Sequence, residues 1–176
     1  GAAMTRRESP TFRISVAAIV GTIAVFLYAA LAAVQILVLN PLAFAPGKPL
    51  SQIHTDLAQA GEAIGTPLVL AILGLGPALA VLLMLLLSRQ PAVGARVVGI
   101  GYAVLLAFGA PAYFIASFGP GMALADTYLT SGADHSGWSF VLYGVSAVAI
   151  VVAAVLALVP QRGAGRQPLK QPTLAE

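Results

Sequence analysis

The stretch 66–87, TPLVLAILGLGPALAVLLMLLL, places twenty-two consecutive residues together without one charged side chain. As an α-helix with a rise of about 1.5 Å per residue, it would be roughly 33 Å long, enough to cross a hydrocarbon layer of about 30 Å. We expect Thr66 to cap its first turn, where Pro67 needs no N–H partner, and Arg89 to lie in water just beyond its end. The stretch therefore predicts a transmembrane helix.

Three further stretches resemble it, and the whole composition agrees with a lipid environment. Of the 176 residues, 59% are hydrophobic and 9% are charged, whereas a soluble domain has about 25% charged residues. The apolar stretch nearest the N-terminus, 14–39, is too long for the roughly 7–15-residue apolar region of a secretory signal peptide. We therefore expect it to be retained as a membrane anchor. The predicted spans are 14–39, 66–87, 97–118 and 138–159.

These spans predict an all-α integral membrane protein, a transmembrane four-helix bundle over residues 14–159. The bundle follows a short N-terminal segment, 1–13, and precedes a polar tail, 160–176, whose Gly, Pro and Gln content is typical of disorder. Two longer loops, 40–65 and 119–137, connect the first span to the second and the third to the fourth. The sequence thus predicts one membrane domain with two terminal extensions.

The basic residues predict the orientation of the chain. Eight of the nine Lys and Arg lie before the first span, between the second and third, or after the fourth, and Lys48 alone lies in a longer loop. The eight are Arg6, Arg7, Arg13, Arg89, Arg96, Arg162, Arg166 and Lys170. Because basic residues stay on the cytoplasmic side, both termini are expected inside and both longer loops outside. A composition rich in Ala, Gly, Val, Leu and Arg favours a bacterial inner membrane.

The loop 40–65 predicts a short amphipathic helix. Three prolines interrupt its first ten residues, after which Ser51 is a suitable cap for a helix over 52–63. Apolar residues at Ile53, Leu57 and Ile64 fall on one face of such a helix. We expect this helix to lie along the membrane surface.

The loop 119–137 predicts a similar arrangement. Gly119-Pro120-Gly121 is expected to end the third span, and a second short helix is expected over 122–130. Asp134 or Ser136 would then cap the fourth span, which Trp138 begins at interface depth.

Prolines and small residues inside the spans predict kinks and close helix contacts. Pro77 and Pro111 each remove one backbone hydrogen bond, so a kink is expected near each. Small side chains at four-residue spacing let neighbouring helices approach closely. The residues assigned to helix packing are Gly21, Gly74, Ala78, Gly99, Ala103 and Ala107.

The predicted spans contain no Asp, Glu, Lys, Arg or His. Proton relays and ion pathways need such groups inside the membrane, so proton-coupled transport is disfavoured. Gln35 is the most polar side chain in the first span. Either it forms a hydrogen bond within the bundle, like the neighbouring hydroxyls, or it lines a polar pocket or partner site.

Most acidic residues and both histidines lie on the side predicted to be external. They are His54, Asp56, Glu62, Asp126, Asp134 and His135. Such a set would suit zinc or acid–base chemistry only if the two loops brought it together, because no HExxH or similar ligand spacing is present. The absence of cysteine excludes thiolate ligands, disulfides and a cysteine nucleophile. We therefore predict no catalytic, cofactor or metal site, and a solvated loop surface instead.

Three functions are compatible with this pattern. The first is an accessory or interaction subunit that packs against another membrane protein or a second copy of itself, in the lipid bilayer. The alternative is a carrier or channel for a neutral or apolar solute or lipid, and a third is a metal-dependent enzyme on the external face. Nucleic acid is not an expected partner, because the basic residues flank the spans rather than gather on one face.

Overall fold

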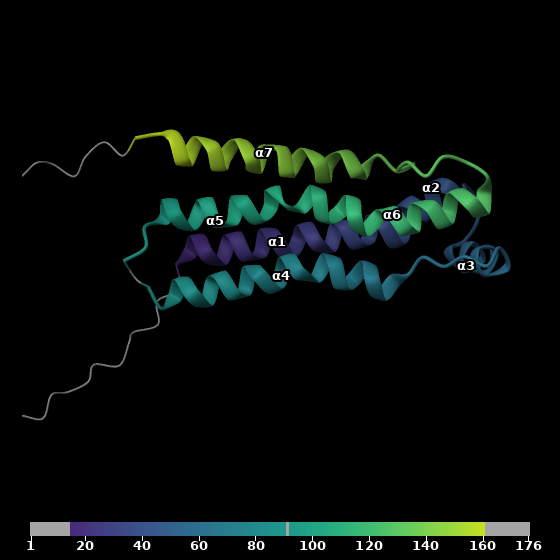
Figure 1. Ribbon diagram of the computed structural model, residues 1–176, viewed down its shortest axis with the longest axis horizontal. Coiled ribbons are helices and arrows are strands. Elements are labelled where there is room, and N and C mark those ends of the chain that lie inside the picture. Colours follow the sequence, from purple (N-terminus) through teal and green to yellow (C-terminus); the bar gives the residue numbers. More distant parts are fainter. Residues whose placement is uncertain (1–14, 91, 161–176) are drawn as a thin grey trace, which may run out of the picture.

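The computed structural model describes residues 15–90 and 92–160, and this part of the chain is helical, without a β-strand (Figure 1). Four helical segments are long and apolar enough to cross a membrane. They are Val16–Phe44, Thr66–Ser88, Ala95–Tyr128 and Trp138–Leu158. The predicted fold class, an all-α membrane bundle of four helices, is confirmed. The predicted N-terminal segment and nearly all of the predicted tail lie outside the described residues.

The first span is one continuous helical rod in three parts, α1 (Val16–Val34), the π-helical turn η1 (Gln35–Leu39) and α2 (Asn40–Phe44). Ser15 caps α1 by accepting a hydrogen bond from the Ala18 N–H. The rod extends five residues beyond the predicted end. In η1 the Asn40 N–H bonds to the Gln35 carbonyl, and this wider turn carries the helix past Pro41, which has no N–H to donate.

The second span, α4 (Thr66–Ser88), begins differently from the prediction. Its N-cap is Gly65, in the left-handed region at φ +67°, and Thr66 is already the first helical residue without a capping bond. Glycine adopts this conformation at low cost, so the backbone rather than a hydroxyl sets the start of the helix. Pro77 lies inside α4, which continues through it.

The third span is interrupted once, between α5 (Ala95–Ala107) and α6 (Gly109–Tyr128). The interruption is at Phe108, next to Ala107. In a regular helix the Ala107 carbonyl would accept a hydrogen bond from residue 111, but Pro111 has no N–H to donate and its ring would clash with that carbonyl. The helix is thus interrupted close to Pro111, and the kinks at Pro77 and Pro111 stay predictions.

The prediction that Gly119-Pro120-Gly121 ends this span was wrong, and so was the separate helix over 122–130. Helix α6 continues through Pro120 to Tyr128. One proline removes one hydrogen bond, a loss that packed membrane helices tolerate. Gly121 has a different role, because a Cβ there would stand 2.8 Å from the Gly132 carbonyl oxygen. Position 121 therefore has no room for a side chain, because the loop backbone at Gly132 lies against it.

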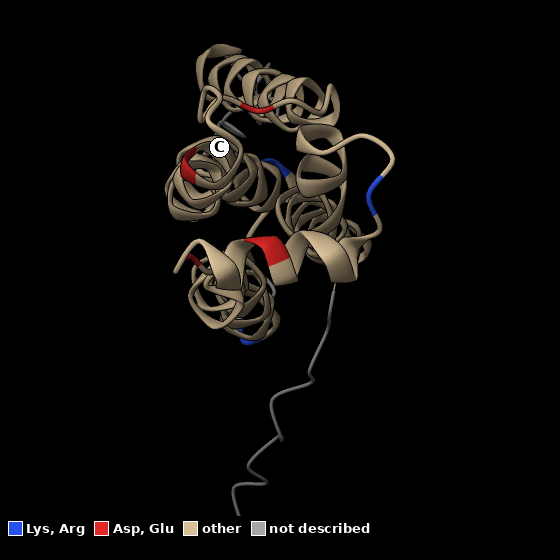
Figure 2. Ribbon diagram, turned by 90° about the vertical axis from the view of Figure 1, so that its right-hand side faces the viewer, with Lys and Arg blue, Asp and Glu red and all other residues tan. Residues whose placement is uncertain are grey.

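The short helix α3 (Leu50–Gln59) lies across one end of the bundle (Figure 2), which we call the α3 end. It buries Ile53 and Leu57 against a cluster that includes Phe44 and Leu124. Its orientation agrees with the predicted surface helix. Pro49, not Ser51, is its N-cap, and it ends at Gln59, before Gly61 at φ +78°.

The fourth span, α7 (Trp138–Leu158), has Gly137 as its N-cap without a side-chain bond, so neither Asp134 nor Ser136 caps it as predicted. In the bundle α1 packs against α4 and α5, while α7 packs mainly against α5. Two apolar cores fill the bundle, one around Tyr28, Leu73, Tyr113 and Leu142 and the other around Ala18, Ala80, Val98 and Tyr102.

The described charges separate to the two ends of the bundle. Lys48 and all four described acidic residues belong to the α3 end, and Arg89 and Arg96 belong to the opposite end. Arg96 also fixes that end, because its guanidinium donates hydrogen bonds to the carbonyls of Leu156 and of Ala157, the latter at 3.0 Å. These are last-turn carbonyls of α7, which have no partner within the helix.

Candidate functional site

The polar side chains inside the bundle are used to join helices. Near the end that carries Arg89 and Arg96, the hydroxyls of Thr22 and Tyr102 lie 2.8 Å apart, and the Tyr102 hydroxyl donates to the Ala80 carbonyl at 3.3 Å. This group links α1, α4 and α5. A hydrogen bond between helices is favourable where no water competes, so the two hydroxyls stabilise the packing.

A second polar group links α1, α5 and α7. Ser146 donates to the Leu106 carbonyl at 2.8 Å and lies 3.2 Å from the Tyr28 hydroxyl, which donates to the Leu142 carbonyl at 3.3 Å. The Tyr28 ring lies against Gly109, where a Cβ would stand 2.6 Å from the ring. The missing side chain at Gly109 thus makes room for Tyr28 beside the interruption of the third span.

The third polar group attaches the loop before α7 to the end of the first span. The Asn40 side-chain oxygen accepts from the backbone N–H of His135 at 2.8 Å and of Ser136 at 3.3 Å. The Tyr113 hydroxyl donates to the Asp134 carboxylate at 2.9 Å. Asp134 therefore holds the loop to α6 and does not cap a helix.

Gln35 belongs to this third group and is fully buried. Its side-chain nitrogen donates to the Ser136 carbonyl at 3.4 Å, but its side-chain oxygen has no hydrogen-bond partner among the described residues. The prediction left open whether Gln35 bonds within the bundle or lines a pocket. The side-chain nitrogen of Gln35 forms a hydrogen bond within the bundle, whereas its buried side-chain oxygen is an acceptor without a partner among the described residues.

The fourth polar group lies at the α3 end. The Asp56 carboxylate accepts from the Lys48 ammonium at 2.6 Å and from the Tyr128 hydroxyl at 2.9 Å. These two donors lower the pKa of Asp56 below its ordinary value, Lys48 having the larger effect. The group fastens α3 and the loop before it to the end of α6.

The predicted external cluster does not gather into a metal centre. Within residues 15–90 and 92–160, no three His, Asp or Glu side chains lie close enough together to hold a metal ion. His54 and Glu62 both line a shallow groove of about 400 Å³ beside the start of α4. The His135 ring packs on Phe44, with ring centroids 3.8 Å apart, and Asp126 is exposed on α6.

The small residues assigned to helix packing divide into two sets. Gly21 meets the Tyr102 ring and Gly99 meets Leu156, so both are packed inside the bundle. Ala103 is buried and Ala107 is half-buried on the same helix, α5. Gly74 and Ala78 are exposed on α4 instead, and a Cβ at Gly74 would find no atom within 4 Å.

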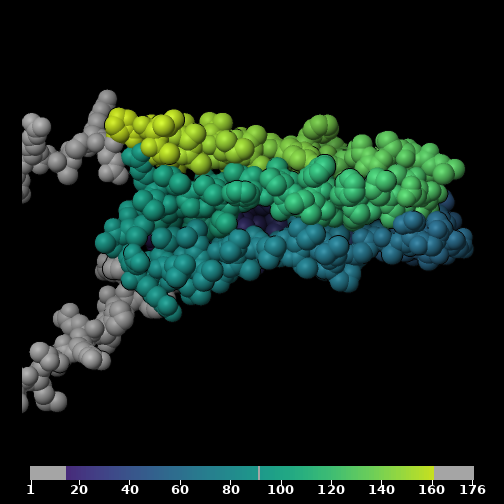
Figure 3. All heavy atoms as spheres, in the orientation of Figure 1, coloured from purple at the N-terminus to yellow at the C-terminus, as the bar shows by residue number. Residues whose placement is uncertain are grey.

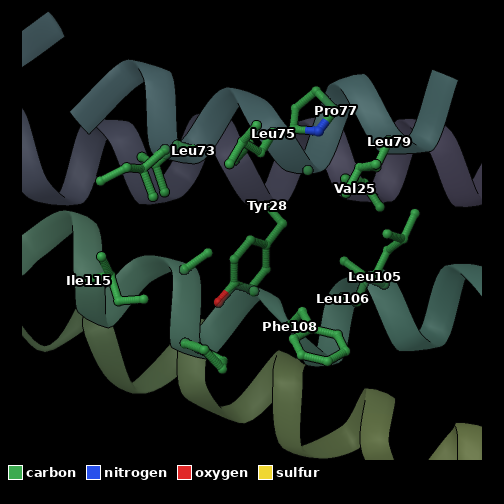
Figure 4. A pocket seen from close by; sticks show the side chains of 16 residues that line it. Val25, Tyr28, Leu73, Leu75, Pro77, Leu79, Leu105, Leu106, Phe108 and Ile115 are labelled. Carbon is green, nitrogen blue, oxygen red and sulfur yellow. The ribbon is translucent and has the colours of Figure 1, made fainter. Parts of the chain in front are cut away.

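An apolar cavity lies between α4 and the α5–α6 rod, with α1 behind it. Its volume is about 320 Å³, and its lining is almost entirely apolar. Figure 3 shows the hollow near the middle of the bundle, where α1 is visible at its floor. Figure 4 shows the α4 side chains Leu73, Leu75 and Pro77 on one side, Leu105 and Phe108 on the other, and Tyr28 between them.

Sequence reasoning had no means of locating this cavity, although it singled out two of the prolines that line it. Pro77 and Pro111 both line it, and both interrupt the hydrogen bonding of their helices. The pair Tyr28 and Gly109 was missed because their contact joins residues eighty-one positions apart.

Comparisons of this chain with protein-family models, with curated proteins and with solved structures found no significant match.

Proposed function

We propose that this chain is an interaction subunit of a bacterial inner membrane, whose α4 packs against a helix of another membrane protein or of a second copy. The observation that carries the proposal is the outward face of α4, where Ala71, Gly74 and Ala78 are exposed. A glycine weakens a helix unless its small size is used, and nothing within this bundle uses Gly74. Small residues at this spacing are typical of faces that receive another helix.

The interior polar groups support a non-catalytic role. Thr22, Tyr28, Tyr102 and Ser146 are each hydrogen-bonded to another helix, so they form no continuous polar path through the bundle. The described spans hold no ionisable carboxylate, amine, guanidinium or imidazole away from their ends. Transport of ions and acid–base chemistry both need such groups, which favours a role in assembly.

The orientation is also part of the proposal. Arg89 and Arg96 at one end, against four acidic residues at the α3 end, favour a cytoplasmic α4–α5 turn and an external α3 end. The chain has no cysteine, so a single introduced cysteine reports its side of the membrane without background. In whole cells an impermeant maleimide should label Ala58→Cys on α3 and leave Ala92→Cys in the turn unlabelled. If only Ala92→Cys were labelled, the orientation of the chain would be the opposite of the one proposed.

The interaction role is tested by placing a large side chain on the outward face of α4. A tagged chain at native expression, purified in mild detergent after crosslinking, should bring down one membrane protein or a dimer. The variant Gly74→Leu should lose that partner, because the added side chain keeps the backbones apart. Ala147→Leu, an exposed small residue on α7, is the matched control and should keep it. A monomer without partner from unmodified cells would contradict the proposal.

A second candidate function, binding or carrying an apolar solute, is favoured by the cavity beside Tyr28. Its apolar lining suits a hydrocarbon and gives no partner to an ion or a sugar. The two functions are compatible, since the cavity opens between α4 and the α5–α6 rod while Gly74 and Ala78 are not among its lining residues.

A further inference from the structure

We infer that the apolar cavity beside Tyr28 is a binding site for one acyl chain of a membrane phospholipid, which enters sideways between α4 and the α5–α6 rod. This inference goes beyond the interaction role and does not depend on a partner subunit. It rests on the depth of the cavity, its opening, its lining and its size.

The depth of the cavity selects hydrocarbon. Its lining residues come from the middle of each span, for example Pro77 within Thr66–Ser88 and Phe108 within Ala95–Tyr128. At that depth the surrounding medium consists of acyl chains, and a headgroup or an ion would leave its water behind at a cost of several kcal/mol. The molecule that meets the opening is therefore a lipid chain.

The lining offers a ligand no free hydrogen-bonding side chain. The hydroxyl of Tyr28, the most polar side chain in the cavity wall, already donates to the Leu142 carbonyl and lies beside Ser146. The other walls are aliphatic side chains, Phe108, and the backbone at Gly76 and Gly109. Dispersion contacts with an apolar chain are the interactions that such a surface can make.

The size suits a chain segment and not a whole lipid. An apolar protein cavity of roughly 150 Å³ binds a benzene ring, and a water-sized group takes about 30 Å³. The volume here, about 320 Å³, is twice as large and corresponds to about ten such groups. One stretch of a single acyl chain fills it, while the second chain and the headgroup remain in the bilayer.

The residues at the floor of the cavity distinguish binding in this site from the lipid contact that every exposed side chain makes. Val25 and Tyr28 on α1 are only 4% and 9% exposed, and both line the cavity. Leu27, on the same helix, is 66% exposed to the surroundings. A lipid chain therefore reaches Leu27 from the bulk bilayer, but it reaches Val25 and Tyr28 only by entering between the rods.

The test uses a phospholipid with a photoreactive diazirine near the end of one acyl chain, in vesicles that contain the purified full chain. After irradiation, adducts are assigned to single residues by mass spectrometry. We expect adducts on Val25 or Tyr28 in addition to those on Leu27. Adducts on Leu27 without any on Val25 and Tyr28 would overturn the inference.

Filling the cavity provides the specific control. Ala112→Trp adds a ring inside the cavity, and it should abolish adducts on Val25 and Tyr28 while those on Leu27 persist. Ile115→Trp, which places the ring at a more exposed lining position, should have the same effect if Ala112→Trp fails to fold. Ala147→Trp on the outer face of α7 should change neither set. Persistent floor labelling in both cavity variants would refute entry by this route.

Two further arms identify the occupant. A free fatty acid with the same diazirine is compared in the same vesicles, and floor labelling by the fatty acid without labelling by the phospholipid would overturn the assignment to a phospholipid. Raising the ratio of protein to lipid should leave floor labelling unchanged. A loss of floor labelling as the ratio rises would show that a second copy of the chain occupies the cavity, and it would also overturn the inference.

Discussion

The Tyr102 ring lies directly over Gly21, so closely that a Cβ on Gly21 would stand 2.3 Å from the Tyr102 Cγ. The contact joins α1 and α5 through the absence of a side chain on one helix and a large ring on the other. The same relationship recurs one layer along the bundle, where the Tyr28 ring lies against Gly109. Glycine and tyrosine thus act as pairs that set the spacing of these helices.

The first prediction concerns Gly21→Ala. The new methyl group would collide with the fixed part of the Tyr102 ring, so α1 and α5 must separate, and overpacking of this kind costs about 1–3 kcal/mol. That loss exceeds the gain of at most about 1 kcal/mol from replacing glycine in a helix. Unfolding in mixed detergent micelles measures the difference. Gly74→Ala is the matched control and should be more stable than the parent by up to about 1 kcal/mol, because nothing within the bundle surrounds Gly74 and the gain in helix propensity is not offset. Equal stability of the two variants would exclude the packing role of Gly21.

The second prediction concerns the hydroxyl pair of Thr22 and Tyr102. Thr22→Val and Tyr102→Phe each remove one of two hydroxyls that lie 2.8 Å apart. Hydrogen bonds between membrane helices are worth about 0.6 kcal/mol on average and at most about 1.7 kcal/mol. A double-mutant cycle on the unfolding free energy should therefore give a coupling of about 0.6 kcal/mol. Independent effects of the two substitutions would mean that each hydroxyl bonds elsewhere in the membrane.

The third prediction concerns Asn40, whose side-chain oxygen accepts two backbone N–H groups of the loop before α7. Asn40→Leu leaves both donors without this partner, at a cost of about 1–3 kcal/mol. The loop keeps its hydrogen bonds from Tyr113 to Asp134 and from Gln35 to Ser136, so we expect more frequent local opening of 131–137 rather than loss of the bundle. Faster amide hydrogen exchange in that segment is the measurement.

Asn40→Asp is the control for this prediction, since it keeps a side-chain oxygen at the same place. Its loop should exchange about as slowly as that of the parent. Fast exchange in both variants would show that the amide nitrogen, and not the oxygen, holds the loop.

The spans were predictable because lipid imposes one strong rule, that a spanning segment must be a helix of sufficient apolar length. The start and end of each helix depend on weaker local effects. Ser51, Thr66 and Asp134 are good capping residues by type, yet Pro49 and Gly65 set two of the starts through their backbone conformation. Asp134 is instead drawn to the Tyr113 hydroxyl, a contact that sequence spacing does not show.

The role of proline also depends on context that sequence does not contain. Pro111 coincides with an interrupted helix and Pro120 with an uninterrupted one, although both follow similar small residues. Pro120 is buried, whereas Pro111 borders the cavity. The cavity alone does not explain the difference, because Pro77 lines it too and α4 continues through Pro77. The cavity and its floor therefore emerge only when the helices are placed together.

The last prediction concerns pH and the attachment of α3. Hydrogen bonds from Lys48 and then Tyr128 lower the pKa of Asp56 below the ordinary value of 3.8. A carboxylate whose pKa is lower in the folded state stabilises the fold at pH above 3.8, and this contribution is lost as the pH falls through the folded value. We therefore expect α3 to loosen from α6 in acid, below pH 3.8.

A carboxyl carbon NMR titration of the chain in detergent measures this pKa directly. Lys48→Gln removes the larger of the two causes and should return the pKa of Asp56 toward 3.8, while the Tyr128 hydroxyl bond still holds it slightly lower. Asp56→Asn, which cannot titrate, should leave the attachment of α3 unchanged by pH in this range. If Asp56 in the parent titrated at or above 3.8, its contacts with Lys48 and Tyr128 would not stabilise the charged form, and the attachment of α3 would rest on Ile53 and Leu57 alone.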